Sequence, residues 1–307
     1  MKIAVIGLGK MGGQIARKLH EDKHNVVVFN RSKDSIDKMA SLGLVPAYTK
    51  EAVINFFGGE PVIIWMMIPS EIVDQELDEW LKLIPQKSIL IDGGNSDFRL
   101  TKKRAELVAK NRSILMDVGT SGGIWGYQNG FSMMVGGSQE FFKIIEPILQ
   151  TLAKPEGAYH YFGKSGAGHF VKMTHNAIEY GMMESLAEGY RILKEGPYKN
   201  IDLIAAGEVW QHHSVITSWL NELTRDALKK NPELTEIEGV VAESGEARWA
   251  LEVAKSLKIE MPAMRAAFKV RLESQKGKIN FATKLLAAMR NAFGGHALKH
   301  TSAQEIC

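Results

Sequence analysis

Short β-rich runs alternate with amphipathic stretches through the first half of this 307-residue chain. The runs are almost entirely apolar, which is typical of strands in a parallel sheet whose two faces are covered by helices. The amphipathic stretches include residues 12–20, 33–42 and 98–111. The alternation predicts an α/β fold with a doubly wound, mostly parallel sheet. The predicted strands are 3–6, 25–29, 61–66, 88–91, 114–118, 131–135 and 159–162.

The strand pattern stops near residue 163, and helical periodicity dominates the remainder of the chain. Gly166 and Gly168 supply a flexible joint at this change of pattern. We therefore predict an α/β domain at 1–164 and an all-helical domain at 165–307. Ligand sites favour the interfaces of such domains. The predicted helices of the second domain are 169–193, 201–210, 247–257, 262–274 and 280–293.

Composition excludes several classes of function. A net charge of +3 is too small to indicate a nucleic-acid partner, although it suits anionic small molecules. No apolar stretch approaches the roughly 18 residues of a membrane helix, and the first residues carry no signal-peptide pattern. The single cysteine, Cys307, is the last residue and allows no internal disulfide. These features predict a cytoplasmic protein.

A Gly-x-Gly-x-x-Gly motif follows the first predicted strand and opens a predicted helix. Glycines at these spacings permit a tight turn and let the backbone approach a pyrophosphate, which the helix N-terminus then binds. The alternative is a glycine-rich turn without a cofactor. We interpret residues 1–164 as a dinucleotide-binding Rossmann domain. The predicted cofactor residues here are Gly7, Leu8, Gly9, Lys10, Met11 and Gly12.

The end of the second predicted strand indicates which dinucleotide binds. NAD sites usually carry an acidic residue there, which bonds the ribose 2′-hydroxyl. This chain instead has Asn30, Arg31 and Ser32, and an arginine can grip a 2′-phosphate. We therefore predict NADP, with NAD possible if Arg31 is only a solvated loop charge. Met67 and Asn95 complete the predicted cofactor site.

Four polar side chains recur with helical spacing in the segment 166–185. Positions i, i+3, i+4 and i+7 share one face of a helix, so an amine, an imidazole, an amide and a carboxylate are expected to lie together. They form a candidate acid–base set. The alternative is a surface charge pair with a structural histidine. The four residues are Lys172, His175, Asn176 and Glu179.

Two polar loops follow predicted strands, at the edge where open α/β sheets bind ligands. One contains Asn95, and the other contains Ser121, Gly122 and Gly123. Small residues and backbone N–H groups there can surround a polyhydroxylated or carboxylate substrate. Ordinary turn chemistry explains the same composition, so that alternative stays open.

Four segments together resemble the decarboxylating 6-phosphogluconate dehydrogenases in their short-chain form, within the β-hydroxyacid dehydrogenase superfamily. The resemblance covers nearly the whole chain. It implies that 6-phospho-D-gluconate is oxidised and decarboxylated to D-ribulose 5-phosphate and CO2, with reduction of NAD(P)+ and without a metal. The pathway role would be pentose phosphate flux or gluconate utilization. The segments are IDGGNS, GTSGGIWG, GAGHFVKMTHNAIEYGMMES and RNAFGGH.

The resemblance also implies individual roles. Lys172 matches the base that removes the C3 hydroxyl proton, for which it must be a neutral amine, and Glu179 matches the acid that protonates the enediol. His175 and Asn176 match orienting residues. Tyr180 matches a phosphate contact. The further residues that match substrate contacts are Asn95, Ser121, Gly122, Gly123, Arg290 and His296.

The C-terminal segment carries two of the residues that match substrate contacts. In the family, Arg290 and His296 come from a neighbouring subunit, which implies a homodimer or homotetramer. An arginine and a glycine cap at a helix end also have structural reasons to exist. Ser244 stands where the long-chain enzymes have a lysine, so Arg248 or Arg271 would supply the missing cation.

Two other functions remain alternatives at this level. One is a β-hydroxyacid dehydrogenase that does not decarboxylate, for which Arg290 and His296 would have less use. The other is a catalytically silent NADP-binding sensor, against which the pair of Lys172 and Glu179 argues.

Overall fold

The computed structural model describes residues 1–299, so Cys307 lies outside the described residues. The chain divides into unit 1, Met1–Met173, and unit 2, Thr174–Cys307. Helix α8 (Ala167–Glu195) begins in unit 1 and continues in unit 2. The predicted domain boundary at residue 164 stays a prediction.

Unit 1 contains an eight-stranded sheet in the order β3-β2-β1-β4-β5-β6-β7-β8. Every adjacent pair is parallel except β6 and β7. The predicted fold class is confirmed. The short strand β3 was not predicted, because two residues carry no periodicity. The strands are β1 (Lys2–Ile6), β2 (Asn25–Phe29), β3 (Val45–Pro46), β4 (Ile63–Met66), β5 (Ile89–Asp92), β6 (Ile114–Ser121), β7 (Ser132–Gly136) and β8 (Tyr159–Gly163).

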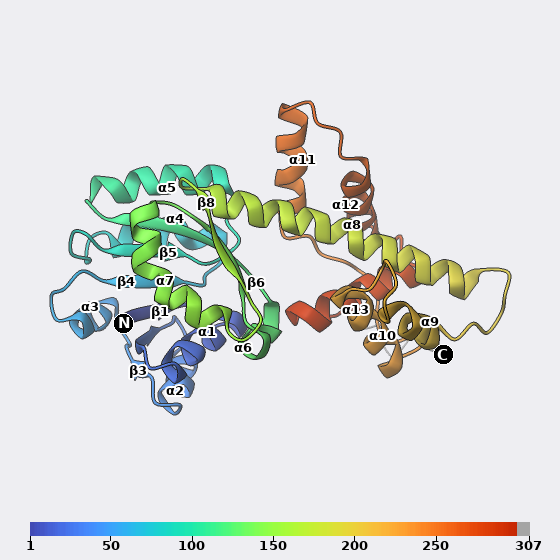
Figure 1. Cartoon of the computed structure of the whole chain (residues 1–307), viewed down its shortest axis with the longest axis horizontal. Coiled ribbons are helices and arrows are strands. Elements are labelled where there is room, and N and C mark those ends of the chain that lie inside the picture. The colour runs from blue at the N-terminus through green and yellow to red at the C-terminus, as the bar shows by residue number, and fades with distance from the viewer. Residues whose placement is uncertain (300–307) are drawn as a thin grey trace. The chain divides into compact units, whose positions relative to one another are not determined.

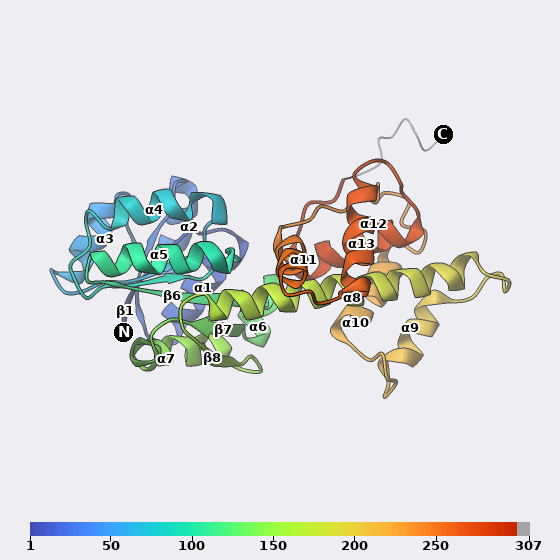
Figure 2. The same cartoon turned by 90° about the horizontal axis from the view of Figure 1, so that it is seen from above.

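Helices cover both faces of this sheet. Figure 2 shows α4 and α5 together on one side and α7 on the other. The helices of unit 1 are α1 (Lys10–Glu21), α2 (Lys33–Ala40), α3 (Lys50–Phe57), α4 (Val73–Trp80), α5 (Phe98–Lys110), α6 (Gly126–Asn129) and α7 (Gln139–Ala153), with single 3-10 turns η1 (Ser70–Ile72) and η2 (Gly123–Trp125).

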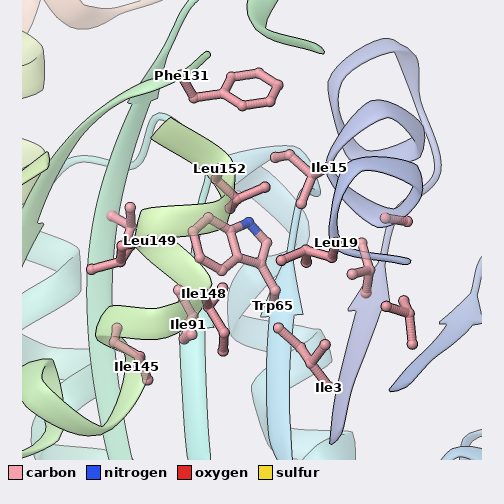
Figure 3. Close-up of a cluster of buried hydrophobic side chains, with 14 of the residues drawn as sticks. Ile3, Ile15, Leu19, Trp65, Ile91, Phe131, Ile145, Ile148, Leu149 and Leu152 are labelled. Carbon is pink, nitrogen blue, oxygen red and sulfur yellow. The ribbon is translucent and has the colours of Figure 1, made fainter. Parts of the chain in front are cut away.

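Each face has its own apolar core, because successive side chains of a strand point to opposite sides. Ile3 and Val5 of β1 pack with α1, α2 and α7, whereas Ala4 and Ile6 pack with α3, α4 and α5. Figure 3 shows the first core, in which the fully buried Trp65 lies among side chains from α1 and α7. Burying a large apolar side chain stabilises a fold by roughly 1.5–3 kcal/mol.

The described part of unit 2 is entirely helical, as predicted (Figure 1). Its core gathers around α13, where Leu285, Leu286 and Met289 are fully buried. A capping box between Asn280 and Thr283 fixes the start of that helix. Besides α8, the helices are α9 (Leu203–Gln211), α10 (Trp219–Lys230), α11 (Glu246–Ser256), α12 (Pro262–Ser274) and α13 (Phe281–Gly294).

Within residues 1–299, none of the helices has both the length and the hydropathy to cross a membrane.

Candidate active site

The glycines of the turn between β1 and α1 are needed for two different reasons. A Cβ on Gly7, whose φ is +86°, would lie 2.3 Å from the carbonyl oxygen of Met67. A Cβ on Gly12 would lie 1.9 Å from the carbonyl oxygen of Gly7. Gly9 has no heavy atom within 4 Å of the same position. Packing within the chain therefore requires Gly7 and Gly12, whereas Gly9 leaves open space where the backbone can approach a ligand.

The start of α1 is suited to an anion. Gly9 is its N-cap and supplies no side-chain hydrogen bond, and the first turn contains no acidic residue. Lys10 is exposed, while Leu8 is buried and Met11 packs against the core. The first backbone N–H groups of a helix and its dipole attract phosphate groups. The turn therefore fits the pyrophosphate of a dinucleotide.

Of the residues after β2, Asn30 has a structural role, whereas Arg31 and Ser32 are exposed. Asn30 accepts a hydrogen bond from the backbone N–H of Leu8 at 3.2 Å, so its amide ties the end of β2 to the turn. Arg31 and Ser32 are exposed. Ser32 is the N-cap of α2 and makes no side-chain capping bond. Arg31 and Ser32 thus stand at the strand end where a ribose substituent is expected.

The loop that carries Asn95 is shaped by a buried carboxylate. Asp92, fully buried at the end of β5, accepts hydrogen bonds from the Gly94 backbone N–H at 3.2 Å and from Ser96 Oγ at 2.7 Å. The buried guanidinium of Arg104 donates to Ser96 Oγ at 3.2 Å. Asn95 itself is exposed at the loop tip. The fixed backbone around it presents its amide outward.

The loop after β6 depends on left-handed backbone. Gly122 has φ of +123° and Gly123 has φ of +53°, conformations that side chains with a Cβ rarely adopt. The side chain of Gln14 on α1 donates to the carbonyl oxygen of Ile124 at 2.8 Å. Ser121, Gly122 and Gly123 are all partly exposed. The loop is therefore anchored to the helix that follows the glycine-rich turn.

A second buried carboxylate fixes the start of α8. Asp117 of β6 accepts hydrogen bonds from the backbone N–H groups of Gly166 at 2.9 Å and His169 at 3.0 Å. The buried ring of His169 contacts Thr101 Oγ1 at 2.7 Å through Nδ1. A carboxylate on the first N–H groups of a helix satisfies donors that otherwise lack partners. Asp117 therefore positions α8 against the sheet.

Lys172 lies one turn further along α8. Its exposed fraction is only 5%. A Cβ on Gly119 of β6 would lie 2.3 Å from the Cβ of Lys172, so this glycine makes room for the lysine stem. Lys172 is thus not a solvated surface charge.

The other three members of the polar set lie in unit 2. His175 Nδ1 is 2.9 Å from Asn176 Oδ1 and 4.0 Å from Glu179 Oε2. The side chains of His175 and Glu179 are 39% and 24% exposed, so each is accessible to a small molecule. Asn176 is buried. The helical spacing does bring these three groups together.

Asn176 has a partner that the sequence did not reveal. Its Nδ2 donates to Glu246 Oε1 at 3.0 Å, and Glu246 is 2% exposed at the start of α11. Ser244 Oγ donates to the other oxygen of this carboxylate at 2.6 Å. The backbone N–H of Ser244 donates to the Tyr180 hydroxyl at 3.3 Å. The loop before α11 is thus joined to α8 by side chains.

Two buried arginines lie beside the same face of α8. The guanidinium of Arg271 stacks 3.2 Å from the ring centroid of Tyr180. Burial lowers the pKa of Arg271 to about 10. Burial also lowers the pKa of Arg290, while the Tyr180 hydroxyl and the Glu179 carboxylate act in the opposite direction. Burying two cations is costly unless anions compensate them. Part of that compensation comes from the chain itself, because the Glu179 carboxylate acts on both arginines and Glu246 and Glu243 act on Arg290.

The remaining candidates at the C-terminal side differ in setting. Arg248 forms an ion pair with Glu243 and is 51% exposed. His296 is exposed beyond the end of α13, where its ring lies edge-on to Phe293 with centroids 6.1 Å apart. Arg290 is buried beside Tyr180 and His296 is not, so the two predicted tail residues have different surroundings.

Three carboxylates that shape the site were absent from the predicted set. Asp92 ends the apolar run of β5 and Asp117 interrupts the apolar run at the start of β6, and a charge at such a position is a readable signal. Glu246 offered no such signal, because it follows a loop and opens a helix like many surface acids. Within the described residues, no group of three or more His, Cys, Asp or Glu side chains could hold a metal ion.

Family models match both halves of the chain. The model of the NAD binding domain of 6-phosphogluconate dehydrogenase matches residues 2–165. The model of the C-terminal domain of 6-phosphogluconate dehydrogenase matches residues 168–284.

Curated relatives of full length agree. YqeC of Bacillus subtilis, whose name places it among the 6-phosphogluconate dehydrogenases only provisionally, is 36% identical over 297 residues, 97% of this chain and 99% of its own. A protein of Haloferax volcanii named as an NAD(+)-dependent, decarboxylating 6-phosphogluconate dehydrogenase is 32% identical over 298 residues, 96% of this chain and 98% of its own.

Solved structures share the architecture. The 6-phosphogluconate dehydrogenase of Plasmodium falciparum, solved in its apo form, with NADP+ and with 6-phosphogluconate, superimposes with a TM-score of 0.80 at 26% identity, covering 94% of this chain and 70% of its own. A 3-hydroxyisobutyrate dehydrogenase of Mycobacterium tuberculosis gives 0.73 at 17% identity, covering 92% of this chain and 97% of its own, which shows the fold alone. The predicted resemblance is confirmed: the chain belongs to the 6-phosphogluconate dehydrogenase family, within the β-hydroxyacid dehydrogenase superfamily, as a dehydrogenase of the nicotinamide-dependent type.

Proposed function

We propose that this protein oxidises and decarboxylates 6-phospho-D-gluconate to D-ribulose 5-phosphate and CO2, with reduction of NADP+. The observation that carries the proposal is the polar face of α8. A buried amine at Lys172 and a partly exposed carboxyl at Glu179 stand two helical turns apart, and two buried arginines lie beside Tyr180 and Glu179. Lys172 serves oxidation, Glu179 serves the proton transfer that follows decarboxylation, and the two arginines serve phosphate binding.

The first step needs a base. When bound, NADP+ would supply the acceptor for the hydride that leaves C3 of the substrate. Lys172 takes the proton of the C3 hydroxyl, so that the carbon–oxygen bond becomes a carbonyl. The resulting ammonium donates a hydrogen bond to that carbonyl oxygen and returns the proton to it as CO2 leaves, so that an enediol forms and Lys172 is a neutral amine again.

The second step needs an acid. Loss of CO2 leaves an enediol, which must gain a proton at the carbon that becomes C1 of ribulose 5-phosphate. Glu179 supplies that proton, and Lys172 takes up the proton of the C3-derived hydroxyl as the ketone forms again. His175 and Asn176 orient the substrate, as do Asn95, Ser121, Gly122 and Gly123 of the strand-end loops.

The phosphate of the substrate requires cations. We assign Arg271 and Arg290 to this group, with Tyr180 as a hydroxyl contact and His296 as a further contact. We also propose that residues 165–307 serve substrate binding and oligomerisation, that the active form is a cytoplasmic homodimer or homotetramer, and that its C-terminal segment completes a site.

The choice between NADP and NAD rests on Arg31 and Ser32, which are exposed at the end of β2 where no acid stands. The Haloferax relative is named as NAD(+)-dependent, so the opposite preference is a specific rival. Measuring kcat/KM with both cofactors decides between them. A clear preference for NAD would overturn the assignment of NADP.

One assay separates the proposed reaction from its two rivals. The protein is supplied with 6-phosphogluconate and either cofactor, and both the reduced cofactor and CO2 are followed. Equal amounts of the two products support the proposal. Reduction without CO2 indicates a non-decarboxylating β-hydroxyacid dehydrogenase, and neither product indicates an NADP-binding sensor.

A further inference from the structure

Glu246 is a buried carboxylate to which the proposed reaction gives no role. It is the first residue of α11 and only 2% exposed. One oxygen accepts a hydrogen bond from Asn176 Nδ2 at 3.0 Å, and the other accepts from Ser244 Oγ at 2.6 Å. Asn176 is 70 positions away in the sequence. A surface acid that only complements the dipole of α11 would have no need of this contact.

The bond between Glu246 and Asn176 fixes which way the amide of Asn176 faces. An ionised carboxylate can only accept hydrogen bonds, so the NH2 group of Asn176 must point toward it. The carbonyl oxygen of the same amide then points the other way. There it lies 2.9 Å from Nδ1 of His175.

The amide in turn fixes the proton on the neutral imidazole of His175. A carbonyl oxygen is an acceptor, so the ring nitrogen facing it must be the donor, and Nδ1 carries the hydrogen. Nε2 is then the acceptor nitrogen of the ring.

We propose that Glu246 is a positioning residue, which acts through Asn176 to hold neutral His175 as the Nδ1–H tautomer. In this tautomer Nε2 accepts a hydrogen bond from a hydroxyl group of the substrate, whereas the other tautomer would present a donor instead. The contribution to catalysis rests on the proposed function, since a polyhydroxylated acid supplies the hydroxyl. The tautomer itself does not depend on the substrate.

The tautomer is measured by long-range proton–nitrogen NMR on substrate-free, 15N-histidine-labelled protein at a pH where the ring is neutral. The chain has nine histidines, so the signal is assigned by its loss in His175→Gln. We expect the wild-type ring to show the Nδ1–H pattern. An Nε2–H pattern for His175 in the wild type would overturn the proposal, whether or not the Glu246 variants fold.

Two variants separate positioning from general packing. Glu246→Gln keeps the shape but can turn either a donor or an acceptor toward Asn176, so we expect the other tautomer to appear. Ser244→Ala is the matched control, because it removes the other hydrogen bond of the same carboxylate and should leave the tautomer unchanged. An unaltered His175 spectrum in a folded Glu246→Gln protein, or an equal change in both variants, would refute the role of Glu246.

Kinetics then test the catalytic consequence. We expect Glu246→Gln to lower kcat/KM for 6-phosphogluconate by about tenfold or more, the scale on which orienting partners act, and Glu246→Asp to recover part of it. The KM for NADP should change by less than about twofold, because the cofactor turn belongs to unit 1. If the wild type does not turn over 6-phosphogluconate, the proposed function fails while the NMR result still decides the inference. An unchanged kcat/KM beside an altered tautomer would refute the catalytic consequence.

Discussion

Units 1 and 2 hold their polar residues by different means. At the glycine-rich turn and at the start of α8, unit 1 relies on its backbone: Gly7 and Gly12 let two segments cross closely, and Asp117 accepts hydrogen bonds from backbone N–H groups. Around the loop after β5, side chains of unit 1 also bond one another, as Ser96 and Asp92 do. In unit 2 side chains hold one another, as in the contacts of Asn176 with His175 and Glu246.

The two arrangements should respond differently to substitutions. A backbone turn depends on a few glycines that are adjacent in sequence, so a single Cβ can disrupt it through steric overlap. A side-chain network distributes its interactions over distant residues, and each buried member left without its partner costs free energy. Substitutions in the glycine-rich turn of unit 1 should therefore divide sharply into tolerated and disruptive, whereas those in the side-chain network of unit 2 should be graded.

The largest effect is expected at Lys172, the buried lysine of α8. Lys172→Met keeps the apolar stem and removes the amine, so turnover should fall by about 10³-fold or more. The affinity for NADP should stay nearly unchanged, as measured by fluorescence titration. The exposed Lys164 provides the control Lys164→Met, which should keep full activity. Retained kcat in Lys172→Met would contradict its assignment as the base.

The glycine-rich turn tests the sharp division expected in unit 1. Gly12→Ala places a Cβ 1.9 Å from a backbone oxygen, so we expect a loss of roughly 3 kcal/mol in the free energy of unfolding. Gly9→Ala meets no atom within 4 Å and should cost within about 1 kcal/mol. It should nevertheless weaken NADP binding, because the methyl group occupies the space left for the pyrophosphate. Similar unfolding curves for the two variants would contradict this division.

Glu184 tests whether effects in unit 2 are graded, through the pH dependence of the free energy of unfolding. Burial, and then the charge of Glu188, raise the pKa of this 7% exposed carboxyl to about 7, whereas Arg271 opposes the shift. The folded state therefore binds a proton that the unfolded state releases near its ordinary pKa of 4.5. Stability from this group is present below pH 4.5 and is lost as pH rises through about 7.

Glu184→Gln should remove that loss and raise the free energy of unfolding at pH 8 by about 3 kcal/mol relative to the wild type. The measurement is denaturant unfolding at a series of pH values. Glu188→Gln, which removes only the neighbouring charge, should give a smaller change of the same sign. Parallel pH profiles for wild type and Glu184→Gln would rule out the buried carboxyl as the cause.

The smallest effect is expected at the exposed Arg31. Arg31→Ala removes a charged hydrogen-bond donor of about 1.5–3 kcal/mol, so kcat/KM with NADP should fall roughly 10- to 100-fold. The value with NAD should change little, since NAD has no 2′-phosphate. Arg99→Ala, at an exposed arginine of α5, is the control. Equal losses of kcat/KM with NADP and NAD would mean that Arg31 does not bind the 2′-phosphate.

Local patterns predicted the sheet, the glycine-rich turn and most of unit 2. All seven predicted strands are present, because an apolar run bounded by turns is a local signal. The helices α3, α4, α6, α7 and α10 were not among those predicted. The contacts of Arg271 with Tyr180 and of Asp117 with α8 could not be predicted, since each partner lies many residues away.

The sequence by itself determined the fold class, the turn suited to a dinucleotide and the polar face of α8, because these follow from backbone sterics and helical spacing within short segments. Only the tertiary structure decided which partners hold those residues: Glu246 for Asn176 and Gly119 for Lys172. The reason is physical. Propensity and periodicity act between neighbours in the chain, whereas a buried hydrogen bond forms only where distant segments pack together.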